Sequence, residues 1–209
     1  MFDYINIAVL ILFIPTFFFV SITPGMCMTL SLSMGMSIGL KKTFYMMYGE
    51  LLGVALVATS SVIGVATIML TYPMAFIILK YLGGLYLFYI GVNMWLSRGK
   101  MALSTEESNF TLSKKKLALQ GFITAIANPK GWAFFITLLP PFIDNNLAFT
   151  PQIIVLVLLI LSLEFTCLMI YATGGITLRK ILQDSSNIKL LNKIAGSMMI
   201  GVSLWLALG

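Results

Sequence analysis

The sequence predicts an all-α polytopic membrane protein whose six transmembrane helices form two inverted three-helix repeats, with the first and fourth helices broken at proline. The 209 residues are 59% hydrophobic and 10% charged, and the mean hydropathy is +1.00, far above the range of a soluble globular domain. A polar loop divides the apolar part into two sets of three segments, each long enough to cross a bilayer. These segments cover residues 5–38, 43–70, 74–96, 117–140, 151–174 and 192–208.

We expect a single transmembrane domain over residues 1–209, with half one at 1–96, a cytoplasmic loop at 97–116 and half two at 117–209. The first 23 residues lack a basic region and a small-residue cleavage site, so we interpret them as a retained span and not as a removable signal. A net charge of +6 would suggest nucleic acid as a partner of a soluble chain. Here the cations lie in short loops between apolar segments, so no nucleic-acid partner is expected.

The first span is longer than a bilayer requires. Residues 4–40 carry no charge, and as one helix they would measure roughly 54 Å, against a hydrocarbon core of ~30 Å. Pro24 removes a backbone donor and Gly25 relaxes the backbone, so we predict a break there. Carbonyls freed at membrane depth need partners in protein, in a water-lined cavity or on a ligand. Thr23, Pro24 and Gly25 are therefore candidate substrate-binding residues, with a simple packing kink as the alternative.

The fourth span carries a corresponding interruption at Asn128, Pro129 and Lys130. Interrupted segments at matching positions of two halves point to an inverted-repeat transporter with its binding site near the midplane. Lys130 lies fourteen residues from both Lys116 and Asp144, so it falls near the middle of its span. We expect Lys130 to pair with a carboxylate of the protein or of a substrate. Asn128, Pro129 and Lys130 complete the predicted substrate-binding set.

Two carboxylates lie deep in the predicted spans, Glu50 in the second and Glu164 in the fifth. Charged side chains at membrane depth are costly and usually face a cavity or a partner. Desolvation and nearby cations together set whether such a carboxyl exchanges a proton near neutral pH. We take Glu50 and Glu164 as candidate proton-coupling residues. The alternative is that both are satisfied by a neighbouring Ser, Tyr or Lys130 and serve packing alone.

The cations predict the orientation of the chain. The first connection, the central loop and the connection before the last span hold 11 of the 13 Lys and Arg residues, while the termini and the other two connections hold none. Cytoplasmic loops carry such an excess of Lys and Arg, so both termini should be extracytoplasmic. The cations concerned are Lys41, Lys42, Arg98, Lys100, Lys114, Lys115, Lys116, Arg179, Lys180, Lys189 and Lys193.

Other chemistries find less support in the sequence. Cys27 and Cys167 are the two thiols, and the chain has no CxxC motif and no His, which argues against a zinc site or a disulfide framework. No set of nucleophile, base and acid suggests an embedded hydrolase. We therefore expect no enzyme activity, no cofactor and no metal site.

Short motifs along essentially the whole chain resemble, in order and spacing, the lysine and homoserine/threonine exporter (LysE/RhtB) family of bacterial amino-acid efflux proteins. The family's usual Pro-Gly-Pro reads Pro24-Gly25-Met26 here. The resemblance implies a six-span inner-membrane protein that exports amino acids or similar metabolites and is driven by the proton motive force. The motifs are Ser21-Ile22-Thr23-Pro24-Gly25, the pairs Gly35/Gly39 and Gly49/Gly53, the stretch 79–87, Asn128-Pro129-Lys130 with Phe134-Phe135 and Leu139-Pro140, Tyr171-Ala172, and Asn192-Lys193 with Gly196.

The leading hypothesis is therefore a secondary transporter in the bacterial inner membrane, a proton antiporter that exports a small zwitterion. Its partners would be an amino-acid substrate, protons and the lipid bilayer, and a homo-oligomer is compatible with it. Two alternatives stay open. One is a divalent metal exporter, for which two carboxylates without His make a poor site. The other is a membrane thiol-disulfide electron carrier. The position of Cys27 beside the first break favours it, whereas the position of Cys167 on the fifth span counts against it.

Overall fold

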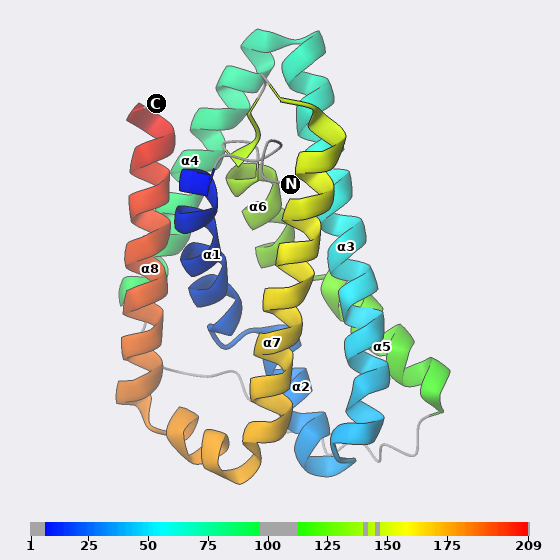
Figure 1. Ribbon diagram of the computed structural model, residues 1–209. Coiled ribbons are helices and arrows are strands. Elements are labelled where there is room, and N and C mark those ends of the chain that lie inside the picture. Colours follow the sequence, from blue (N-terminus) through cyan, green and yellow to red (C-terminus); the bar gives the residue numbers. More distant parts are fainter. Residues whose placement is uncertain (1–6, 97–112, 140–141, 145–146, 209) are drawn as a thin grey trace.

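A computed structural model describes residues 7–96, 113–139, 142–144 and 147–208 of the protein. Every regular element in these ranges is a helix and none is a strand, which confirms the predicted all-α class for the described part of the chain. The helices run roughly along one axis as a bundle (Figure 1). They are α1 (Ile7–Ile22), α2 (Met26–Ser37), α3 (Leu40–Thr71), α4 (Pro73–Leu96), α5 (Lys114–Ile126), α6 (Pro129–Leu138), α7 (Phe149–Gln183) and α8 (Ser185–Leu208).

Among the described residues, two helical segments are long and apolar enough to cross a membrane. They are Leu40–Val65 of α3, with a mean hydropathy of 1.6, and Phe149–Gly175 of α7, with 2.9. A third candidate span is formed by Phe13–Ile22 and Met26–Ser37 taken together, which are bent by 57°. The protein is thus membrane-embedded, while the count of six spans stays a prediction.

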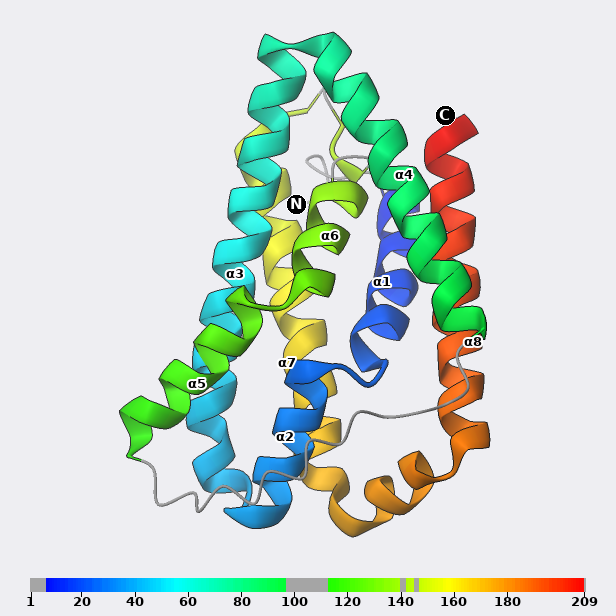
Figure 2. The same cartoon turned by 180° about the vertical axis from the view of Figure 1, so that it is seen from behind.

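Two short breaks divide the apolar helices near the middle of the molecule. The first covers residues 23–25 between α1 and α2, and the second covers residues 127–128 between α5 and α6. Figure 2 shows both breaks about midway along the bundle axis. Neither Pro24 nor Pro129 has a backbone N–H. At Pro129, the first residue of α6, the loss costs little because a backbone N–H at that position has no acceptor within the helix.

Close backbone contacts hold the helices of the two halves together. A Cβ atom added at Gly49 of α3 would lie 1.8 Å from the carbonyl oxygen of Ala118 in α5, and one at Gly35 of α2 would lie 2.3 Å from that of Ala172 in α7. Gly35 and Gly49, each the first glycine of its motif pair, thus lie where two helices approach closely. Gly39 differs, because its φ of 78° places it in the turn after α2, where an added Cβ atom would meet nothing within 4 Å.

Two hydrophobic clusters fill the interior, one on each side of the breaks. The Phe cluster includes Phe13, Phe17, Phe134, Phe135 and Phe142, and the Met cluster includes Met28, Met34, Met46 and Met47. Along α3 and α7 the two clusters follow one another. The change from one to the other falls between Leu51 and Val54 on α3, just after Glu50, and at Glu164 on α7.

The connection before the last span is more helical than the sequence predicts. The predicted fifth span ended at residue 174 and the sixth began at 192, but α7 continues past a kink at Gly175 (φ 46°, ψ −134°) and α8 begins at Ser185. Asp184 stabilises the start of α8, because its Oδ1 accepts hydrogen bonds from the Ser186 hydroxyl at 2.6 Å and from the Ser186 amide at 2.8 Å. These bonds hold the pKa of the Asp184 carboxyl below its usual value.

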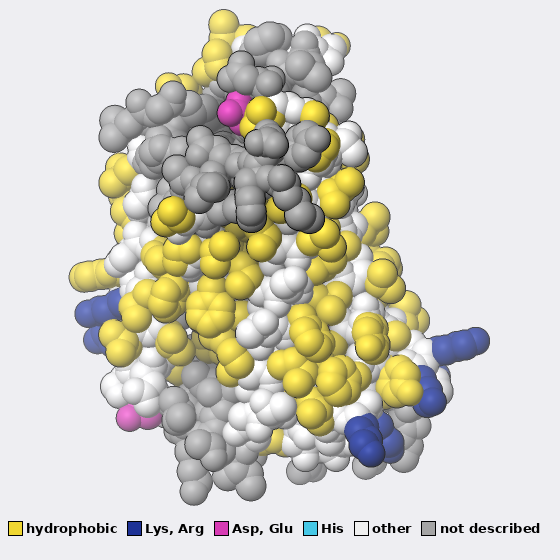
Figure 3. Space-filling model, viewed as in Figure 1, with side chains coloured by type: hydrophobic (Ala, Val, Ile, Leu, Met, Phe, Trp, Pro, Cys, Tyr) yellow, Lys and Arg dark blue, Asp and Glu magenta, His cyan; other side chains and the backbone are white. Residues whose placement is uncertain are grey.

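The exposed lysines that the structure describes gather toward one end of the bundle. In Figure 3 the Lys and Arg side chains on the visible face all lie in its lower half. Lys114, Lys115 and Lys116 are exposed at the start of α5, and Lys41 and Lys42 are exposed at the start of α3. Residues 97–112 of the predicted cytoplasmic loop lie outside the described part.

Candidate functional site

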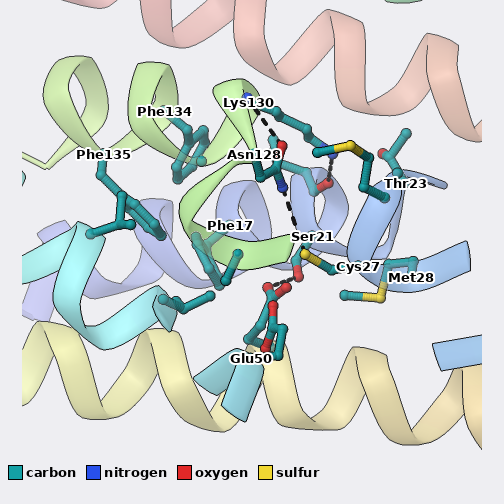
Figure 4. A pocket seen from close by; sticks show the side chains of 18 residues that line it. Phe17, Ser21, Thr23, Cys27, Met28, Glu50, Asn128, Lys130, Phe134 and Phe135 are labelled. Atoms are coloured by element: carbon teal, nitrogen blue, oxygen red, sulfur yellow. Dashed lines mark hydrogen bonds between the residues drawn. The ribbon is translucent and has the colours of Figure 1, made fainter. Parts of the chain in front are cut away.

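A cavity of about 60 Å³ lies where the two helix breaks come together with α3 and α7. The residues before and after the α1–α2 break line one part of the cavity, and those around the α5–α6 break line another (Figure 4). The cavity therefore lies at the boundary between the Phe cluster and the Met cluster.

Most of the predicted site residues line this cavity, although they come from distant parts of the sequence. Pro24 and Pro129 do not line it: Pro24 lies within the first break and Pro129 begins α6. What the residues do there stays a prediction. Those that line the cavity are Thr23, Gly25, Glu50, Asn128, Lys130 and Glu164.

The carbonyls at the end of α1 are satisfied by side chains. The Lys130 ammonium donates to the Val20 carbonyl at 2.7 Å, and the Tyr171 hydroxyl donates to the Ile22 carbonyl at 2.8 Å. The Thr23 hydroxyl donates to the Phe19 carbonyl at 2.7 Å. Because an unsatisfied carbonyl in an apolar environment is costly, these bonds stabilise the broken helix. Lys130 also connects the two breaks.

The two helices that begin at the breaks differ at their N-termini. Asn128 caps α6, because its side-chain oxygen accepts a hydrogen bond from the Lys130 amide at 3.2 Å. Gly25 precedes α2 in extended backbone (φ −149°, ψ −173°), and no side chain caps that helix. The first residues of α2, Met26–Met28, line the cavity. The partial positive charge of this helix end is therefore open to an anionic group.

The two glutamates meet in the cavity with different partners. Glu164 accepts a hydrogen bond from the Ser21 hydroxyl, and Lys130 lies within electrostatic range of its carboxyl. Glu50 is fully buried, and neither of its oxygens makes a hydrogen bond of acceptable geometry within the described part of the chain. Glu164 and the Cys27 thiol are polar neighbours that interact with Glu50. A buried carboxyl without a partner is costly, so this position calls for a proton or a cationic ligand.

Both cysteines are free thiols, but only one of them lines the cavity. The Asn128 amide donates to Cys27 Sγ at 3.7 Å. Cys167 is fully buried in the Met cluster. Within the described residues, no group of three or more His, Cys, Asp and Glu side chains is arranged to hold a metal ion.

Sequence reasoning missed Ser21 and the apolar lining of the cavity. Val54 and Val57 follow Glu50 at helical spacings of four and seven residues, so they share its face of α3, and both line the cavity. That helical spacing is the sequence signal that could have identified the two valines as lining residues. Of the tyrosines near the glutamates in sequence, Tyr171 reaches the first break, whereas the Tyr48 side chain is 62% exposed and points away from the core.

Comparison with known proteins gives matches over most of the chain. A family model described as LysE type translocator matches residues 18–209. An uncharacterized membrane protein of Vibrio cholerae is 26% identical, with 90% of each chain covered. A leucine efflux protein of Enterobacter sp. (strain 638) is 27% identical, with 91% of this chain and 90% of the relative covered. A homoserine/homoserine lactone efflux protein of Salmonella typhimurium is 28% identical, with 69% of each covered. No solved structure matches this one.

Proposed function

Since the chain belongs to the LysE type translocator family, it is a transport protein and not an enzyme, and we propose that it exports amino acids or similar small zwitterions. Two relatives named for the efflux of leucine and of homoserine or its lactone support this substrate class. The unpartnered Glu50 carboxyl in the cavity is the single observation that carries the proposal. A buried carboxylate there is complementary to an ammonium group.

The polar groups of the cavity suit both charges of a zwitterion. We assign the substrate ammonium to Glu50 and the substrate carboxylate to the uncapped start of α2, where Gly25 lines the cavity. Thr23, Asn128 and Lys130 surround this position. Pro24 and Pro129 act in the proposal by shaping the two breaks and not by contact with substrate.

Proton coupling follows from a competition for one carboxylate. Glu50 can hold a proton or the substrate ammonium, but not both, so release of the substrate on one side and uptake of a proton there would exchange one for the other. Glu50 is the leading candidate because Ser21 and Lys130 already serve Glu164. Glu164 remains in the proposal as the second coupling residue, since it adjoins Glu50.

The six-span architecture with inverted repeats also belongs to the proposal, as does the single domain over residues 1–209. Cross-packing of the halves supports it, because α3 of half one packs against α5 of half two, while α7 of half two packs against α1 and α2 of half one. In an inverted-repeat transporter the two halves rock about a site at the midplane. We place the protein in the bacterial inner membrane with both termini extracytoplasmic.

Efflux of preloaded labelled amino acids tests the proposal, with cells that contain or lack the protein and with vesicles that hold equal amounts of it. We expect the wild-type protein to drive uphill efflux under a pH gradient. Glu50→Gln should lose uphill efflux because Gln cannot carry the proton, and exchange of labelled for unlabelled substrate should weaken because the amide offers the substrate ammonium no countercharge. Glu106→Gln, in the polar central loop, is the matched control and should behave as wild type.

Two results would contradict these proposals. Equal efflux of every compound with and without the protein would remove the exporter function. Full uphill efflux in both Glu50→Gln and Glu164→Gln would end the carboxylate-coupling mechanism and leave the exporter function standing.

A further inference from the structure

The cavity has two chemically different ends. The phenyl rings of Phe17, Phe134 and Phe135 lie together at one end, and Thr23, Asn128 and Lys130 lie away from them (Figure 4). Within the described part of the chain, three charged side chains line the cavity, and one of them, Glu164, interacts with the other two, Glu50 and Lys130. The polar end is the site proposed above for the substrate's two charges.

The apolar end begins directly beside Glu50. Val54 and Val57 lie on the Glu50 face of α3, about 6 Å and about 10 Å farther along the helix axis by helical rise. Their side chains are 8% and 1% exposed, and both line the cavity. With the ammonium held at Glu50, a side chain that extends from the amino acid's α-carbon along this face of α3 would meet Val54 first. The chain thus places an apolar surface where the substrate's side chain would lie.

The apolar end is a firmly packed wall. The centroid of the Phe17 ring lies 5.5 Å from that of Phe134 and 6.1 Å from that of Phe135, and the Phe134 and Phe135 centroids are 5.8 Å apart. Rings in mutual contact hold one another in place. Such a wall sets the size and polarity of the group that it accepts.

We propose that this apolar end is the side-chain subsite of the exporter and that the substrates are α-amino acids with uncharged aliphatic side chains. The inference rests on the proposed function. A charged side chain would be desolvated against the rings with no countercharge. Val54, Val57 and Phe134 are then the residues that determine specificity.

Competition in proteoliposomes tests this substrate class. The measurement is exchange of labelled L-leucine by wild-type protein against unlabelled leucine, valine, threonine, lysine and glutamate. Valine and threonine have the same shape and differ by one hydroxyl. We expect valine to compete between about 10-fold and 100-fold better than threonine, the range that an apolar pocket achieves against such an isostere. Lysine and glutamate should not compete.

Two variants locate the subsite, each with its own readout. Val54→Thr replaces one methyl group by a hydroxyl and keeps the shape of the side chain. The potency of threonine as a competitor, relative to that of valine, should therefore rise about tenfold. Val57→Ala removes two methyl groups and enlarges the subsite, so the potency of phenylalanine as a competitor, relative to that of leucine, should rise about tenfold. This second variant tests the subsite even if Val54→Thr fails to fold. The matched control is Val65→Thr, at a buried position of α3 that does not line the cavity, and its ratios should equal those of wild type.

The outcomes separate this inference from the proposed function. Competition by lysine, glutamate or threonine equal to that by valine overturns the inference and leaves the exporter function intact. Unchanged ratios in a folded, active Val54→Thr or Val57→Ala overturn the subsite. The absence of exchange for every amino acid overturns both proposals together.

Discussion

Glu50 and Glu164 border the same cavity but are held in different ways. Glu164 accepts a hydrogen bond from Ser21 and faces Lys130, whereas Glu50 has no hydrogen-bond partner among the described residues. Removal of one member of a buried charged pair leaves the other uncompensated, and such a loss costs about 3–5 kcal/mol. The two glutamates should therefore respond differently to the same substitution.

Glu164→Gln should lower the yield and thermal stability of the protein, because the Lys130 ammonium loses the carboxylate that it faces. Glu164→Gln combined with Lys130→Met should recover part of the loss, since the uncompensated cation is gone. The midpoint of thermal aggregation in detergent measures both. Glu50→Gln is the matched control and should keep wild-type stability. A double variant less stable than Glu164→Gln would contradict this account.

Cys27→Ser together with Cys167→Ser should leave transport largely intact. Serine at position 27 keeps a polar side chain beside the Asn128 amide, which donates to Cys27 Sγ, and nothing in the spacing of the thiols indicates exchange chemistry. Gradient-driven efflux per amount of purified protein is the measurement. Lost activity at normal yield would instead favour the thiol-disulfide electron carrier.

At the scale of the helices, glycine contacts determine how closely the two halves approach. α3 and α5 pack most tightly where Gly49 meets Ala118 and where a Cβ atom added at Gly121 would lie 2.0 Å from the Met46 carbonyl oxygen. Backbone cannot move aside as a flexible side chain can, so any side chain at these positions separates the helices. This interface holds the segment of α3 that carries Glu50.

Gly49→Ala should destabilise the protein by about 1–3 kcal/mol or more, as overpacking of a tight interface does. Gly64→Ala is the matched control on the same helix, because an added Cβ there meets nothing within 4 Å. That change should be neutral or stabilise by up to about 1 kcal/mol, since alanine is the better helix former. Thermal midpoints of the purified variants measure both effects, and equal midpoints would refute the role of the close contact.

At the scale of the whole molecule, charge asymmetry sets the orientation in the membrane. The exposed lysines at the starts of α3 and α5 lie toward the end of the bundle opposite the α3–α4 turn (Figures 1 and 3). Positive charge is retained on the cytoplasmic side. The bundle should therefore stand with the α3–α4 turn outside.

Cysteine labelling in a Cys-free background tests this orientation. Ser104→Cys, in the central loop, should resist an impermeant reagent added to intact cells and react after permeabilisation. Tyr72→Cys, in the exposed turn between α3 and α4, should react in intact cells. Reaction of the residue at position 104 from outside would overturn the orientation.

The sequence by itself determined the helical class, the membrane environment and most of the polar residues of the cavity. Apolar length and the scarcity of charge leave helices as the natural structure in lipid, and each ionisable group at membrane depth is conspicuous. Glu50, Lys130 and Glu164 could be found in this way. The aromatic wall could not, because nothing in the local pattern distinguishes Phe134 or Phe135 from the many other apolar residues that pack the core.

Only the tertiary structure decided which groups meet. Ser21 and Glu164 are 143 positions apart, and Lys130 is 110 positions from the Val20 carbonyl that it binds. It also decided that the two glycines of one motif pair differ: Gly39 lies in a turn, whereas Gly35 lies at a close helix contact. Such pairings depend on how separate helices approach in space, which no local periodicity encodes. For this reason two glutamates that look equivalent in the sequence have different partners in the folded protein.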